Sequence, residues 1–273
     1  MWKSKYETKT YTVEEKFSNI SVHSVTSDVE IVLTDDGSCR VECDETTRLG
    51  YYVHVNDDTL MVEVSDTRKW YDHISILGDL GEKKLTVYVP MAEYGSVCVD
   101  NNTGDVRLSS GMVANSFDVK ANTGDVKCVS VKALQSLFVS TNTGDINIDN
   151  ADATDVEIST TTGKINVYKM WCNNLDVDLS TGDVWLDEVV ALGYFDIECT
   201  TGSVTIESSD ASSINIKTNT GNVYASFITG KIVFADTTTG EIDIPHSTSG
   251  APCNIKTTTG DITVEIKPLK EDK

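Results

Sequence analysis

The chain has 273 residues, of which 43 are acidic and 22 basic, and its formal net charge is −21 at pH 7. Such an acidic surface repels phosphates and so excludes nucleic acid as a partner, whereas basic peptides or metal ions are allowed. No apolar segment is long enough to cross a membrane, and no signal peptide is recognisable, so the sequence as it stands is expected to be cytoplasmic. If an export signal or anchor has been removed, the cell surface or envelope is expected instead.

Residues 1–95 lack a regular repeat but contain short runs of alternating apolar and polar residues, as in residues 20–22 and 60–64. Alternation with period two is typical of strands with one buried face. Residues 24–29 resemble the corner of the later repeats without its glycine. We therefore predict an irregular β-rich N-terminal cap over 1–95, continuous with the solenoid, because an open solenoid end exposes unpaired strand edges.

From residue 96 onward, a Thr-Gly pair recurs nine times at intervals of 19 or 20 residues. A constant period of this length indicates a stacked array with one supersecondary unit per repeat. The glycines are Gly104, Gly124, Gly144, Gly163, Gly182, Gly202, Gly221, Gly240 and Gly260.

Four positions in each repeat are apolar without exception. They lie seven and five residues before the glycine and two and four residues after it, as in Leu175, Val177, Val184 and Leu186. The residues between them are mostly polar, so each repeat is predicted to form a strand, a Thr-Gly corner and a second strand, with one face buried. Valine and isoleucine dominate because branched side chains pack well on a pleated surface.

Two architectures fit this unit: antiparallel hairpins of a sandwich, or coils of a β-solenoid whose equivalent residues stack about 4.8 Å apart. The uniform columns favour the solenoid. The predicted fold is all-β: a single-stranded, right-handed β-solenoid (β-helix) of about nine 19–20-residue coils over 96–267, each stacked on the next, and a charged tail over 268–273.

Stacking also predicts a column of aspartates directly after the glycines. Like charges in one column should repel, and the chain interrupts the column with Lys164, Ser203, Asn222 and Glu241. The asparagines and threonines of the corners are expected to form hydrogen-bonded ladders from coil to coil. The aspartates are Asp105, Asp125, Asp145, Asp183 and Asp261.

Candidate functional residues are few. The four histidines lie far apart without zinc spacing or a nucleophile–base pair, so no catalytic residue, metal site or cofactor is predicted. Asp178 and Glu198 should stack on neighbouring coils with Lys217 on the next, which gives a carboxylate-plus-lysine patch. Such a patch suits a β-helix enzyme acting on polysaccharides, but any acidic rod produces similar groupings as ordinary solvated surface.

Aromatic side chains at nominally outward positions add to this candidate binding surface. Single exposed aromatics are normal, whereas a cluster on one face would form a contact surface for carbohydrate or protein. We include Trp185 and Tyr224 with Asp178, Glu198 and Lys217 in the candidate surface. The outward aromatics are Phe138, Trp185, Tyr224, Phe227 and Phe234.

The leading segment 17–22, the strand 85–90 and the Thr-Gly corners from Thr103 to Gly260 together resemble DUF4097, a bacterial adhesin-like family of unknown function. The resemblance extends from about residue 10 to residue 266. It implies a β-solenoid and a surface role, and it supplies no catalytic residues.

The first functional hypothesis is therefore a non-catalytic solenoid that binds glycans or cationic peptides, in association with the bacterial cell envelope. A second is an intracellular scaffold that self-associates through its solenoid ends, which the seven cysteines favour because unpaired thiols suit a reducing compartment. A third is a polysaccharide-active enzyme with a cleft at Asp178, Glu198 and Lys217.

Overall fold

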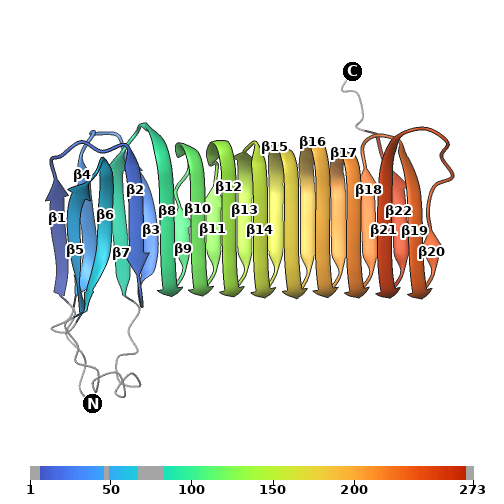
Figure 1. Ribbon diagram of the computed structural model, residues 1–273, viewed down its shortest axis with the longest axis horizontal. Helices are drawn as coiled ribbons and strands as arrows, with labels where there is room; N and C mark the ends of the chain where they lie inside the picture. The colour runs from blue at the N-terminus through green and yellow to red at the C-terminus, as the bar shows by residue number, and fades with distance from the viewer. Residues whose placement is uncertain (1–6, 46–48, 67–82, 269–273) are drawn as a thin grey trace, which may run out of the picture.

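The computed structural model describes residues 7–45, 49–66 and 83–268. These residues form one continuous rod of stacked β-coils (Figure 1). The predicted all-β solenoid is therefore confirmed, whereas the hand of its coil remains a prediction. No helix long and apolar enough to cross a membrane occurs in the described ranges.

Each regular coil contains a long strand that leads into a Thr-Gly corner and a shorter segment that follows it. The long strands pair in parallel and in register from coil to coil, and so do the short segments. In the first regular coils the long and the short strands are separate elements. They are β8 (Glu93–Thr103), β9 (Val106–Leu108), β10 (Val113–Thr123), β11 (Val126–Val129), β12 (Lys132–Thr143), β13 (Ile146–Asp152) and β14 (Asp155–Thr162). The next three each run from one corner to the following one: β15 (Ile165–Thr181), β16 (Val184–Thr201) and β17 (Val204–Thr220).

The four apolar columns predicted from the sequence face the interior between the two sheets. All four column residues are buried in every repeat from that of Gly104 to that of Gly221, and also in the repeat of Gly260. Cys128, Cys199 and Cys253 are buried within or beside these columns, and all seven cysteines are free thiols. The core is thus a continuous stack of like side chains along the rod axis.

The Thr-Gly-Asp corners are held by three hydrogen-bond ladders. The N–H groups of the corner glycines from Gly104 to Gly221, and that of Gly260, donate to the threonine carbonyl of the adjacent coil. Threonines such as Thr141 and Thr160 donate to the glycine carbonyls at 3.1 and 3.3 Å. Asp105 accepts the backbone N–H of Asp125 at 3.0 Å, and Asp125 accepts that of Asp145 at 2.8 Å. The aspartates of this column therefore connect neighbouring coils by hydrogen bonds, in addition to the repulsion expected between their charges.

A second corner in each coil was not foreseen. Left-handed residues about six positions after the glycine turn the chain, and a short inward-facing segment of small and apolar residues follows. The turn is made without glycine in five coils, so the sequence carries no marker for it. The turning residues are Ser130, Asn150, Lys169, Glu188 and Ser208, and the buried ones include Ala114, Ala133, Cys172, Ala191 and Ala211.

The N-terminal region begins with a coil that belongs to the stack. The strands β2 (Asn19–Ser24) and β3 (Asp28–Thr34) pair in parallel with β8 and β9, and the turn between them packs against Gly104. The predicted glycine-free corner is therefore confirmed. The strands that cover this coil are β1 (Glu7–Val13), β4 (Cys39–Glu45), β5 (Leu49–Asn56), β6 (Thr59–Asp66) and β7 (Lys84–Pro90). The pairs β1–β4, β4–β7 and β5–β6 are antiparallel.

A buried carboxylate joins these covering strands. Glu45 accepts hydrogen bonds from Tyr11 at 2.6 Å and from the Tyr51 N–H at 2.9 Å, and it forms an ion pair with Lys9 at 2.5 Å. Burial would raise the pKa of Glu45, but the hydrogen bonds from Lys9 and Tyr11 outweigh it and lower the pKa. The Tyr51 hydroxyl bonds Ser24 and Ser27, so the network connects the cap to the first coil.

The two coils at the other end are stacked out of chain order. β21 (Ala251–Thr259) pairs with both β17 and β19 (Lys231–Thr239), while β22 (Ile262–Ile266) pairs with both β18 (Val223–Phe227) and β20 (Ile242–Asp243). The ninth repeat thus lies between the seventh and the eighth. The expectation that each coil stacks on the next in sequence is wrong here, and β19 and β20 form the outermost coil (Figure 1).

The outermost coil is incompletely buried because no coil covers it. Its column residues Val233, Ala235 and Ile244 are half-buried, and Ile242 is exposed. In the described residues, the outer edge of β19 has no partner strand. Self-association through the solenoid ends stays a prediction, now centred on this edge. The division into a cap at 1–95 and regular repeats at 96–267 also stays a prediction, and residues 269–273 of the predicted tail lie outside the described residues.

The register of β15 leads to a direct test. Val177 is 1 % exposed in the core, whereas the neighbouring Asp178 points outward. Val177→Asp is expected to lower the free energy of unfolding by about 3 kcal/mol because it buries an unpaired charge. Asp178→Val, the matched control, should change it by less than about 0.5 kcal/mol. Urea denaturation of both variants measures this, and equal midpoints would contradict the register.

Candidate functional site

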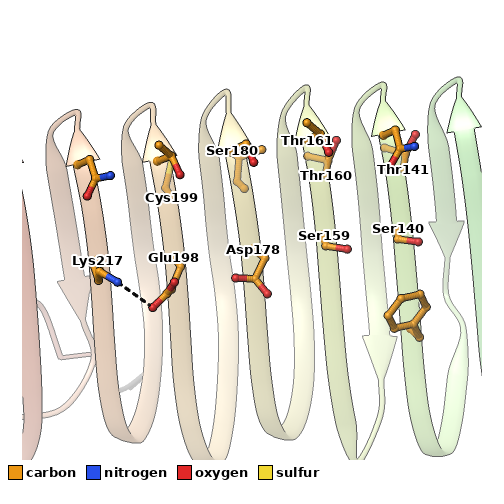
Figure 2. Close-up of a pocket in the computed structure, with 15 residues that line it drawn as sticks. Ser140, Thr141, Ser159, Thr160, Thr161, Asp178, Ser180, Glu198, Cys199 and Lys217 are labelled. Carbon is orange, nitrogen blue, oxygen red and sulfur yellow. Dashed lines mark hydrogen bonds and ion pairs between the residues drawn. The ribbon is translucent and has the colours of Figure 1, made fainter.

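An open groove of about 430 Å³ lies on the face of the solenoid formed by the long strands, here called the long face. Its middle is a row of side chains from β12, β14, β15, β16 and β17, one from each coil (Figure 2). The row runs Ser140, Ser159, Asp178, Glu198 and Lys217, in register from strand to strand. Three of the five predicted surface residues are therefore brought together.

The groove follows from side-chain length. Ser140 and Ser159 are short, whereas Phe138 beside them and Asp178 and Glu198 on the next coils are long, so the surface is hollow over the serines. A second outward row nearer the corners lines the groove with hydroxyl and carboxamide groups. Its members are Asn142, Thr161, Ser180, Thr200 and Asn219.

Carboxylates gather at and beside the groove. Glu157, Asp176 and Asp196 stack in the neighbouring outward row of the same strands. Two of these carboxylates already have neutral donors: the Tyr194 hydroxyl donates to Asp176 at 2.9 Å, and Asn215 donates to Asp196 at 2.7 Å. Hydroxyl and carboxamide donors leave the negative charge in place, so this part of the long face remains strongly acidic.

Of the two carboxylates that line the groove, Asp178 is the one without a compensating group. Lys217 lies 3.3 Å from Glu198 and so is engaged there, as the dashed line in Figure 2 marks. Among the described residues, Asp178 has neither a hydrogen-bond donor nor a cation paired with it. Burial raises the pKa of Asp178, and the charges of Glu198 and Asp176 raise it further. An external cation placed over Asp178 would relieve this repulsion.

Trp185 and Tyr224 lie elsewhere. Both follow a corner glycine, so they belong to the sheet of short segments, where Thr205 separates them in register. Trp185 is 38 % exposed, and the Tyr224 hydroxyl donates to Glu265 at 2.8 Å and lies 3.0 Å from the Lys267 ammonium. The five candidate residues thus divide between two faces of the solenoid, three on one and two on the other.

The remaining outward aromatics also divide. Phe227 is wrong as an outward residue: it is fully buried, because the register slips after Ile206 and the end of β18 turns into the core beside Lys231. Phe138 and Phe234 both lie on the long face. Phe234 also borders a second hollow on the long face, beside Asn215 and Asn254, and this hollow was not predicted from the sequence.

No group of three or more His, Cys, Asp and Glu side chains that could hold a metal ion occurs within residues 7–45, 49–66 and 83–268. The arrangement offers charge, hydroxyl groups and aromatic rings on an open surface. Such a surface can hold a cation at Asp178 and form hydrogen bonds along the row from Asn142 to Asn219.

Comparisons with known proteins agree with this architecture. The family described as Toastrack DUF4097 matches residues 17–189 and 170–272. A solved structure of a "putative adhesin" from Bacteroides fragilis is similar with a TM-score of 0.54 and 14 % identity, covering 96 % of this chain and 97 % of the other. A second "putative adhesin", from Parabacteroides distasonis, has a TM-score of 0.50 and 12 % identity, covering 95 % and 97 %.

At these identities the structural likeness extends to the fold alone, and comparison with curated proteins gives no match. The family match, in contrast, spans nearly the whole solenoid and its cap. By that match, the chain belongs to the Toastrack DUF4097 family.

Proposed function

We propose that this protein is a non-catalytic, adhesin-like binding protein of the bacterial cell envelope that holds an extended cationic ligand along its long face. The observation that carries the proposal is Asp178, a carboxylate in a groove, crowded by like charges and without a cation among the described residues. An array of carboxylates in register on adjacent strands suits a ligand that also repeats.

The alternative of a polysaccharide-active enzyme receives less support. Catalytic acid and base groups act by converging on one bond, whereas Asp178, Glu198 and Lys217 stand in a row, one per coil. Lys217 is also occupied by Glu198 in an exposed ion pair. The two similar solved structures described as putative adhesins fit a binding role, and we extend that role to this chain as part of the proposal.

Deca-lysine is a suitable first probe because its amines stay charged across the acidic and neutral range. We expect measurable binding by titration calorimetry that weakens as salt is raised, and Asp178→Asn should weaken it about tenfold. Asp149→Asn, on the sheet of short segments, is the matched control, because it removes one exposed carboxylate away from the long face and should leave affinity nearly unchanged.

The pH dependence has a defined sign. The ligand binds the charged carboxylate, and the pKa of Asp178 is raised, so affinity should fall as the pH drops through that raised pKa, earlier than for an ordinary aspartate. Asp178→Asn should remove this part of the pH profile. Equal affinity of wild type and Asp178→Asn for every cationic probe would contradict the proposed site.

A further inference from the structure

A second hollow of about 370 Å³ lies at the C-terminal end of the long face. It is lined by Phe234, the carboxamides Asn215 and Asn254, and the ion pair of Lys256 with Asp236 at 3.4 Å. Phe234 is 61 % exposed, although its column otherwise carries acids and amides across the middle coils. An exposed phenyl ring beside two carboxamides and an ion pair differs from an ordinary acidic surface.

The hollow continues the groove. Asn215, Asn254 and Phe234 are successive members of one outward row, and Lys217, Lys256 and Asp236 are successive members of the row beside it. Lys217 lines the groove and pairs in register with Lys256 of the hollow, so the two depressions lie on neighbouring strands of the same face. The insertion of β21 between β17 and β19 sets the order within each row, and it places Phe234 and Asp236 on the outermost coil.

Phe138 is a half-buried member of the same outward row on β12, and the Lys120 ammonium lies 5.0 Å from the centre of its ring. From Phe138 the row passes through Glu157, Asp176, Asp196, Asn215 and Asn254 to Phe234. Six strand spacings separate the two rings, which corresponds to about 29 Å. Two aromatic rings therefore bracket a track of carboxylates, carboxamides and hydroxyl groups.

We propose that this track binds an extended oligosaccharide that carries free amino groups, with a sugar ring seated on Phe234 and the chain running toward Phe138. The inference rests on the proposed function and names its ligand class. A sugar ring presents a C–H face to an aromatic ring and hydroxyl groups to carboxamides and carboxylates, and both partners are present at Phe234. The amino groups would lie over Asp178 and its neighbours, where the negative charge is concentrated.

The spacing of the coils favours a glycan over a peptide. Equivalent side chains recur about every 4.8 Å, a distance close to the length of one sugar unit in an extended chain. The second outward row, from Asn142 to Asn219, repeats its hydroxyl and carboxamide groups at the same interval along the groove. A basic peptide uses the carboxylates and can place a cation over a ring, but it leaves the hydroxyl and carboxamide row without hydrogen-bond partners along its length.

The test compares three probes: a β-1,4-linked glucosamine hexamer, its fully N-acetylated form and deca-lysine. We expect the glucosamine hexamer to bind tightest, and Phe234→Ala to weaken it about fivefold. Phe234→Trp should retain the affinity. Trp171→Ala is the matched control, because Trp171 is 62 % exposed but follows the second corner and lies off the long face.

The outcomes separate the two proposals. If deca-lysine binds as tightly as the hexamer and Phe234→Ala has no effect, the ligand is a cationic peptide and the glycan inference is wrong, while the proposed function stands. Equal binding of the N-acetylated hexamer would overturn the role of the amino groups. If none of the probes binds, both proposals are wrong. Unfolding midpoints of the variants, expected to match wild type, verify that only binding has changed.

Discussion

Lys231→Ala is expected to lower the free energy of unfolding by about 3–5 kcal/mol, the cost of leaving a buried charge without its partner. Lys231 is fully buried, and its ammonium donates to the Asp210 carboxylate and, at 2.8 Å, to the Thr229 hydroxyl. It also lies 5.5 Å from the centre of the Phe227 ring. Because Lys231 opens β19, the pair ties the outermost coil to β17.

Asp210 makes the loss severe. It is 8 % exposed, and its Oδ2 has no hydrogen-bond partner within the described part of the chain, so the lysine is its main compensation. Urea denaturation measures the effect, with Lys217→Ala as control. The ion pair of Lys217 with Glu198 is exposed, and losing it should change the free energy of unfolding by less than about 0.5 kcal/mol.

A double variant distinguishes the stability lost through an unpaired buried charge from the stability lost through side-chain packing. Lys231→Met combined with Asp210→Leu removes both charges and should recover much of the stability that Lys231→Ala loses. Hydrogen exchange should place the loss in β19 and β21 first, because these strands form the end of the rod. Similar stability of Lys231→Ala and Lys217→Ala would contradict the role of the buried pair.

The regular coils were predictable because each carries its own complete signal. The apolar columns and the Thr-Gly corner specify strand, turn and buried face within a single repeat, and stacking follows from their identity. The second corner escaped prediction because residues such as Lys169 and Glu188 turn the chain in the left-handed region without a glycine to mark it.

The exchange of the last two coils could not be predicted from the same signal. Coils with equal corners fit each other in any order, so the columns around Gly240 and Gly260 do not distinguish the two stackings. The deciding contacts are between segments distant in sequence, such as Lys231 with Asp210. The residues of the sequence that relate to this exchange are a lysine and an exposed phenylalanine in one repeat, Lys231 and Phe234. Their roles can be recognised only from the tertiary structure.

Part of the candidate site followed from position within the repeat. Asp178, Glu198 and Lys217 each stand four residues before a glycine, and so their stacking in one row was predicted correctly. Trp185 and Tyr224 each stand three residues after one, which places them beyond the corner on the other sheet. The hollow at Phe234 was not predicted, although Asn215, Phe234 and Asn254 each stand six residues before a corner glycine. The exchange adds the open outer side of Phe234, because it places β19 on the outermost coil.

The largest loss of stability is expected from Gly202→Ala, which should lower the free energy of unfolding by about 5 kcal/mol or prevent folding. Gly202 has a φ of 146°, and an added Cβ would lie 1.6 Å from the carbonyl oxygen of Gly182 on the adjacent coil. That oxygen is backbone and also accepts a contact from Cys199, so it has little freedom to move. Urea denaturation or, for an unfolded variant, circular dichroism provides the measurement.

Gly37→Ala is the control that distinguishes the stability lost to backbone strain from the stability lost to a clash between stacked coils. Gly37 has a φ of 71° in the turn after β3, but nothing lies within 4 Å of the position its Cβ would take. Its cost should be about 1–2 kcal/mol, the strain of a left-handed residue alone. Equal losses at Gly37 and Gly202 would mean that strain explains both. A much larger loss at Gly202 would mean that the corner glycines are required because the coils approach too closely for any side chain. The ligand track of the long face depends on the coil spacing that this close approach allows.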